Sequence, residues 1–163
     1  MAHSAFIGLG GNLGDAQATL ITAIQLLTSD RHIRSWRMSS LLETTPEQPL
    51  SPQPHYWNGV LLLRTDERPW ALFRRMRQIE KKLGKSPKPQ HAPRPIDLDL
   101  LWISGMRSSL PYLQLPHPRF MNRRFVLEPL LEIVPEIAGL PPLQEALATC
   151  PTDQKILQKI AYL

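Results

Sequence analysis

The chain lacks the features that would place it in a membrane, an oxidising compartment or a repeat architecture. Its one cysteine, Cys150, cannot form a disulfide within the chain, and without a second cysteine the five histidines make no recognisable zinc pattern. No apolar run approaches the roughly 18–20 residues of a transmembrane helix. Residues 1–4 lack the charged and apolar regions of a signal peptide. We therefore expect a cytoplasmic protein that does not contact a membrane.

Low-complexity tracts and internal repeats are absent as well, and the composition is that of a globular protein. The 163 residues are 42% hydrophobic and 20% charged, which predicts a single domain spanning residues 1–163. The net charge of +5 indicates an anionic partner. Because the chain has no dense basic tail and no RNA-binding motif, a small polyanion such as a nucleoside triphosphate is favoured over nucleic acid.

One segment of the chain alternates apolar and acidic side chains. A strand would place Ile96, Leu98 and Leu100 on one face, and Asp97 and Asp99 on the other. The first face would pack in the core and the second would stay open. Aspartate is depleted in strands and neighbouring like charges repel, so a cation is expected between the two carboxylates.

The paired carboxylates predict a site for divalent metal. Spaced by roughly 6–7 Å along a strand, they could hold two ions about 3.5–4 Å apart, the arrangement that clamps attacking and leaving oxygens in phosphoryl transfer. Mg²⁺ is the expected ion, because one or two carboxylates together with substrate phosphates satisfy it. The pattern alone is also compatible with solvated acids on a half-exposed strand.

Periodicity and turn residues predict the order strand, helix, strand, strand, helix, strand. The expected elements are strand 5–9, helix 15–28, strand 33–42, strand 56–63, helix 70–83 and the acidic strand. This order predicts a ferredoxin-like α+β fold, an antiparallel sheet with packed helices that form an αβα sandwich. Beyond it we expect a helix from about residue 125 that stops before Pro135, then one or two small amphipathic helices within residues 143–163.

Two proline-rich loops, residues 44–54 and 84–92, are expected to close over a nucleotide, because loops of this length are uncommon unless disordered or functional. Residues 8–14 fit Gly-x-Gly-x-x-x-Gly, which makes a nicotinamide-dependent enzyme an alternative. That fold requires a second buried strand ending in an acidic residue, and residues 33–42 are too polar for it.

Five blocks occur together in one order: residues 9–15, 43–46, 56–58, 93–100, and 115–119 with 123–127. In order and spacing they resemble the hydroxymethyldihydropterin pyrophosphokinase family of folate biosynthesis, from about residue 5 to Pro135. The resemblance implies transfer of the β,γ-pyrophosphoryl group of ATP to the hydroxymethyl oxygen of a reduced pterin, with release of AMP. It also implies a magnesium requirement, a ferredoxin-like fold and a monomer.

The resemblance implies roles for particular residues. The catalytic residues would be Arg94, Asp97, Asp99 and Lys85, and the two aspartates would bridge two Mg²⁺ ions. The pterin-binding residues would be Thr44, Thr45, Tyr56, Asn58 and Phe125. The ATP-binding residues would be Glu80, Arg94, His117 and Arg123. Aromatic stacking suits a flat heterocycle, and an amide supplies the donors and acceptors that reject its analogues.

Without the resemblance, several of these residues have simpler interpretations. Tyr56 and Phe125 would be core aromatics, Glu80 would form a surface ion pair worth under about 1 kcal/mol, and His117 would be structural. A basic nucleic-acid-binding module with aromatic base platforms is the alternative function. It gives Asp97 and Asp99 no role, since carboxylates repel phosphate.

The chain departs from the family pattern in three places. In the first loop, Thr45, Glu47 and Gln48 differ from the usual pattern, so we expect a pterin lid of a different shape. Gly11 stands where the family usually has serine. The second loop is one residue shorter, with Lys85 and Lys88 where two arginines are common. Because lysine keeps the charge but loses the bidentate fork, we hypothesise that this loop neutralises phosphate but closes less effectively.

Overall fold

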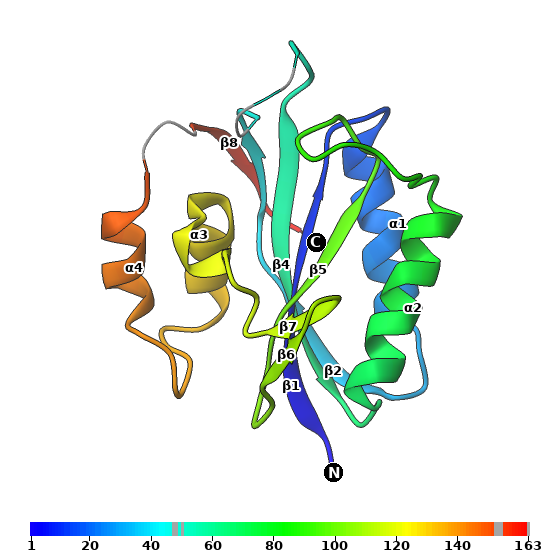
Figure 1. Ribbon diagram of the computed structural model, residues 1–163, viewed down its shortest axis with the longest axis vertical. Helices are drawn as coiled ribbons and strands as arrows, with labels where there is room; N and C mark the ends of the chain where they lie inside the picture. Colours follow the sequence, from blue (N-terminus) through cyan, green and yellow to red (C-terminus); the bar gives the residue numbers. More distant parts are fainter. Residues whose placement is uncertain (47–48, 50, 152–154, 163) are drawn as a thin grey trace.

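An antiparallel sheet lies between two layers of helices (Figure 1). The computed structural model describes residues 1–46, 49, 51–151 and 155–162. The strands are β1 (His3–Gly11), β2 (Ile33–Met38), β3 (Leu41–Thr44), β4 (Tyr56–Thr65), β5 (Asp97–Ile103), β6 (Ser108–Leu110), β7 (Leu113–Leu115) and β8 (Ile156–Ile160). The helices are α1 (Ala16–Thr28), α2 (Pro69–Lys82), the 3₁₀ turn η1 (Phe120–Asn122), α3 (Arg124–Ile133) and α4 (Leu143–Thr149).

The strand order of the main sheet confirms the predicted ferredoxin-like α+β fold. The order is β5-β1-β4-β3-β8, with β2 paired to the C-terminal half of β4 and all pairs antiparallel. Each of the helices α1 and α2 connects two strands of this sheet, as in a split βαβ unit. Helices α1 and α2 cover one face of the sheet, and α3 and α4 cover the other (Figure 1).

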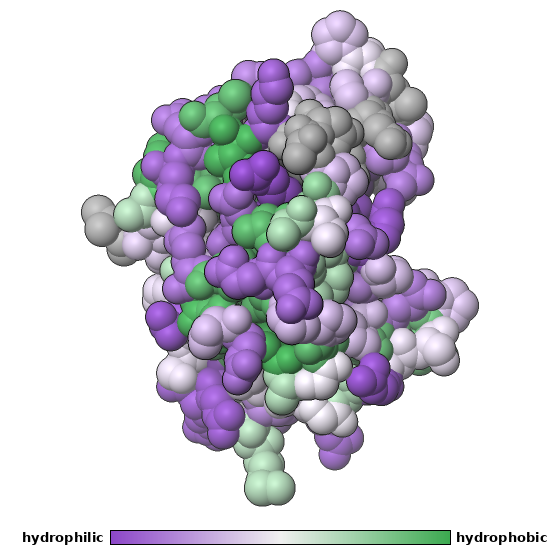
Figure 2. All heavy atoms as spheres, turned by 90° about the vertical axis from the view of Figure 1, so that its left-hand side faces the viewer, coloured by the Kyte–Doolittle hydropathy of each residue, from purple (hydrophilic) through white to green (hydrophobic). Residues whose placement is uncertain are grey.

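Alternation along the strands divides the hydrophobic residues between two cores. On β1, Ala5, Ile7 and Leu9 belong to the core under α1 and α2, whereas Phe6 belongs to the core under α3 and α4. Figure 2 looks onto the α3 and α4 side, where hydrophobic residues form patches separated by hydrophilic ones. No helix in the described part of the chain is both long and apolar enough to cross a membrane.

The predicted strand 33–42 is divided in two at Ser39. The Ser39 amide donates to the Val60 carbonyl at 3.0 Å, and the Val60 amide donates to the Ser39 hydroxyl at 2.9 Å. A side-chain oxygen thus takes the place of a backbone acceptor, and the ladder is interrupted between β2 and β3. The prediction of one continuous strand was wrong for this reason.

One or two small helices were predicted for the C-terminal segment, and one is present. Helix α4 is present, but residues 156–160 form the strand β8 rather than a second helix. β8 pairs with the free edge of β3, where Ile160 lies opposite Leu41 and Ile156 lies opposite Thr44. A segment this short is marginal as a helix, and two β-branched isoleucines beside an open edge favour the strand.

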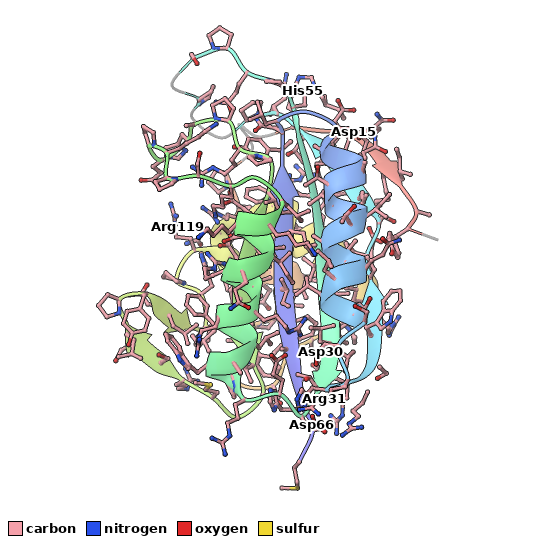
Figure 3. The ribbon with its side chains drawn as sticks, turned by 90° about the vertical axis from the view of Figure 1, so that its right-hand side faces the viewer. Asp15, Asp30, Arg31, His55, Asp66 and Arg119 are labelled. Carbon is pink, nitrogen blue, oxygen red and sulfur yellow. The ribbon has the colours of Figure 1, made fainter. Side chains whose placement is uncertain are left out.

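The two proline-rich loops lie at the same end of the sheet (Figure 1). The second loop runs from the end of α2 to the start of β5 and is described throughout. Residues 47, 48 and 50 of the first loop lie outside the described residues. Figure 3 shows His55 at this end, and Asp30, Arg31 and Asp66 at the opposite end.

A buried ion pair connects α1, α2 and the segment that follows β4 at that opposite end. The Arg75 guanidinium donates to the Glu67 carboxylate at 2.8 Å through Nη2, and through Nη1 to the carbonyls of Leu26 and Leu27 at the end of α1. The Glu67 carboxylate is almost fully buried, so its charge depends on this partner.

We predict that Arg75→Met lowers the free energy of unfolding by about 3–5 kcal/mol, because it leaves the buried Glu67 carboxylate unpaired. Arg34→Met is the matched control, since Arg34 is exposed and pairs with the Asp66 carboxylate at the same end. Urea unfolding followed by circular dichroism would measure both. Equal losses in the two variants would contradict the assignment.

Candidate active site

The acidic strand has the predicted geometry. Leu98 and Leu100 are buried in the core, while Asp97 and Asp99 are half-buried on the other face of β5. On the neighbouring strand β1, Gly10 lies opposite Asp97 and Gly8 lies opposite Asp99. Because glycine has no side chain, the sheet beside the carboxylates is left open as the floor of a cleft.

This cleft, the main cleft, is lined by residues of the second proline-rich loop, of strands β1, β4 and β5, of the segment between β7 and α3, and of α3 itself. Of the site residues predicted from sequence, those that line it are Tyr56, Asn58, Lys85, Arg94, Asp97, Asp99, His117, Arg123 and Phe125. Gly8, Gly10, Gly59, Gln90, His91, Leu101, Arg119 and Val126 also line it. Thr44, Thr45 and Glu80, which the sequence also predicted, lie elsewhere.

Two cations lie against Asp97. The Lys85 ammonium is 2.6 Å from the Asp97 carboxylate, and the Arg94 guanidinium donates to both of its oxygens at 3.3 Å. Burial by itself would lower the pKa of Lys85, but the carboxylates of Asp97 and Glu80 outweigh it and raise that pKa. Lys85 therefore stays positively charged within the cleft.

Glu80 lies behind the acidic strand and is only 4% exposed. Its carboxylate accepts hydrogen bonds from the Leu98 amide at 2.7 Å and from Lys85 at 2.9 Å, and it pairs with Arg77 at 3.0 Å. Burial raises the pKa of Glu80, and these partners offset part of that effect. The interpretation of Glu80 as a surface ion pair was wrong, because its partners hold it inside the protein.

His117 is held with one ring nitrogen facing the backbone. The Arg119 amide donates to His117 Nδ1 at 3.2 Å, so in the neutral ring the proton lies on Nε2. Burial lowers the pKa of His117; Asp99 opposes this effect, while Arg123 and Arg119 add to it. A neutral imidazole with Nε2 as donor can bind a phosphate oxygen without adding charge. In Figure 3, Arg119 points outward beside α2.

One part of the main cleft is lined by the amide residue Asn58 and by the aromatic residues Tyr56 and Phe125. Asn58 Nδ2 donates to the Thr44 hydroxyl at 2.7 Å, and both side chains are buried. Tyr56 and Phe125 also line the cleft, so they are not purely core residues. Thr44 therefore supports the cleft residue Asn58 and does not line the cleft itself. The amide and hydroxyl of Thr45 are bonded to the Lys155 backbone instead.

Asn12 links the two loops, a role that was not predicted from the sequence. Asp15 caps α1 by accepting from the Ala18 amide. Asn12 Nδ2 donates to Gln53 and Pro54 of the first loop, and its oxygen accepts from the Arg94 amide at 3.0 Å. One buried side chain therefore fixes both loops relative to β5.

A second hollow adjoins the main cleft and was not predicted. Its walls are Phe73 and Arg77 of α2 and residues 111–114 around the β6–β7 turn. It shares Asp99, His117 and Arg119 with the main cleft. Trp70 stacks on Phe73 and meets Tyr112 edge-on, each with 5.5 Å between ring centroids. The short hairpin carried no recognisable sequence signal.

A sheet that presents two carboxylates beneath a ring of cations, between two connected hollows, is the arrangement of an enzyme that handles phosphorylated substrates. Residues 6–135 match the sequence profile of 7,8-dihydro-6-hydroxymethylpterin-pyrophosphokinase. The chain belongs to this family, as the five sequence blocks predicted, and is a pyrophosphokinase that acts in folate synthesis.

Individual relatives agree with the family match. The chain is 37% identical over 134 residues to the 2-amino-4-hydroxy-6-hydroxymethyldihydropteridine pyrophosphokinase of Synechocystis sp., covering 82% of this chain and 68% of the relative. It is 34% identical over 137 residues to the Bacillus subtilis enzyme of that name, covering 84% and 81%. A crystal structure of HPPK-DHPS in complex with substrates has a TM-score of 0.67 at 12% identity, covering 91% of this chain and 43% of that one.

Gly11 lies where a side chain cannot be accommodated. A Cβ at this position would be 2.4 Å from the Pro95 carbonyl oxygen, just before the acidic strand. At Gly8 a Cβ would meet only the flexible side chain of Leu101, at 3.3 Å. Glycine at position 11, where the family usually has serine, therefore allows the close approach of β1 and the second loop.

We predict that Gly11→Ala destabilises the protein by about 1–3 kcal/mol, because the backbone at Pro95 must move away. Gly8→Ala is the control and should have a smaller effect, since Leu101 can change its rotamer. Thermal unfolding of the two variants measures the difference. A larger loss in Gly8→Ala than in Gly11→Ala would contradict the packing described here.

Proposed function

We propose that this chain transfers the pyrophosphoryl group of ATP to the hydroxymethyl oxygen of 6-hydroxymethyl-7,8-dihydropterin, releasing AMP, with magnesium held at Asp97 and Asp99. The observation that carries the proposal is the position of the two carboxylates. Asp99 lines both hollows, so a substrate in each would bring its reacting end to the same acidic strand.

The main cleft suits the pterin. One part of this cleft offers the aromatic residues Tyr56 and Phe125 and the amide of Asn58. A flat bicyclic heterocycle would stack on the rings and hydrogen-bond to the amide through its edge. Because Thr44 accepts one amide hydrogen of Asn58, the side-chain orientation is fixed and its remaining polar groups face the ligand.

The second hollow suits the nucleoside of ATP. Phe73 and Tyr112 provide aromatic walls for a base, and the hollow opens towards His117 and Arg119, which also line the main cleft. A triphosphate that runs from this hollow towards the pterin passes over Asp99 and Asp97. The ring of cations along that path matches its negative charge.

The residues at the acidic strand fit magnesium. The described part of the chain holds no cluster of three or more metal-binding side chains, and two carboxylates alone would leave a cation short of ligands. Mg²⁺ is commonly bound by one or two carboxylates completed by substrate phosphates and water. When bound, it neutralises charge on the transferring group and on the oxygens to either side.

The chain's own cations supply the remaining stabilisation. Lys85 and Arg94 are held beside Asp97, so they are placed without further ordering where negative charge develops. His117, Arg119 and Arg123 line the opposite side of the path. In this proposal the protein works by positioning and charge neutralisation, and none of its side chains forms a covalent bond with substrate.

We predict that the wild-type protein forms AMP from ATP, magnesium and the hydroxymethyl pterin, and that Asp97→Asn lowers the rate by about 100-fold or more because a charge-stabilising ligand is lost. Removal of magnesium with EDTA should abolish AMP formation. Asp15→Asn is the matched control, because Asp15 only caps α1. Salt-dependent oligonucleotide binding without AMP would instead support the nucleic-acid-binding alternative.

The two lysines of the second loop are predicted to differ. Lys85 lines the main cleft, whereas Lys88 is exposed and donates to the Pro93 carbonyl at 3.1 Å. Lys85→Ala should lower kcat by about 10- to 100-fold, since a fixed cation is removed beside the transferred group. Lys88→Ala should change kcat less than about 2-fold. Single-turnover rates would show this, and equal losses would contradict it.

A further inference from the structure

Strand β5 lies at one end of the strand order, and its outer edge faces α2. Leu98 sits between the two aspartates, and both of its backbone polar groups are bound by side chains of α2. The Leu98 amide donates to Glu80 Oε1 at 2.7 Å, and the Leu98 carbonyl accepts from Arg77 Nη2. An ion pair on a helix thus takes the place of a neighbouring strand.

The same carboxylate also holds Lys85. Glu80 Oε1 accepts from the Lys85 ammonium at 2.9 Å, and that ammonium reaches Asp97 at 2.6 Å. The other oxygen, Oε2, pairs with Arg77 Nη1 at 3.0 Å. One buried carboxylate therefore connects the backbone between the two aspartates with the cation that lies against one of them.

We infer that Glu80 is a positioning residue: with Arg77 it holds the peptide of Leu98 and the ammonium of Lys85 in one fixed relation to the carboxylates of Asp97 and Asp99. The inference rests on the proposed function. It departs from the expectation that Glu80 binds ATP, because Glu80 lines neither the main cleft nor the second hollow as they are described.

Energetics support a positioning role over a purely stabilising one. Withdrawing a carboxylate from water costs several kcal/mol, and buried ion pairs often stabilise no better than apolar side chains of the same size. Glu80 is 4% exposed and satisfied by three different donors. Its directional hydrogen bonds fix a backbone group and a side chain, which an apolar residue could not do.

The test compares Glu80→Gln with Glu67→Gln, a second buried glutamate whose arginine partner lies at the other end of the sheet. Glutamine at position 80 can still accept from Leu98 but loses the charge that holds Lys85 and Arg77. We expect kcat to fall by about 10- to 100-fold, as a displacement of about 1 Å can cause, with KM for ATP and pterin changed less than about 2-fold. Glu67→Gln should lower thermal stability and leave kcat within about 2-fold.

Two further measurements keep the inference testable. Glu80→Asp retains the charge and should recover part of kcat, including where Glu80→Gln folds poorly. Amide hydrogen exchange at Leu98 should be slow in the wild type and faster in Glu80→Ala, whatever the activity. A raised KM for ATP with unchanged kcat, or unchanged exchange at Leu98, would overturn the inference. A wild-type protein that forms no AMP would contradict the proposed function instead.

Discussion

Two aspartates held side by side on one face of an edge strand are the constraint on which the rest of this structure depends. Unit charges about 6–7 Å apart repel by roughly 2–3 kcal/mol at an effective dielectric constant of about 20. Groups around β5 accommodate or offset this repulsion. Glycines of β1 leave space, Lys85 and Arg94 bring positive charge to Asp97, and α2 binds the backbone of Leu98.

The fold places two kinds of recognition on either side of this strand. In the proposed function, β4 and α3 supply an amide and aromatic rings for the pterin, while α2 and the β6–β7 hairpin supply aromatic walls for the nucleoside. The side chain of Asn12 forms hydrogen bonds with both proline-rich loops. The positions of both loops therefore depend on one side chain.

Sequence patterns predicted the parts of this arrangement that are local. The alternation from Ile96 to Leu100 was enough to orient Asp97 and Asp99, and the family resemblance brought distant residues such as Asn58 and His117 to the same cleft. The sequence could not predict that Glu80 is buried, because its partners come from β5 and the second loop. β8 was missed because the open edge of β3 that it pairs with exists only in the folded sheet.

The most direct test of the central claim is a crystal structure of the protein with a non-hydrolysable ATP analogue, magnesium and the hydroxymethyl pterin. We expect magnesium between the phosphates and the carboxylates of Asp97 and Asp99, with the pterin between Tyr56 and Phe125. Magnesium bound away from both aspartates, or a pterin bound outside the main cleft, would contradict it.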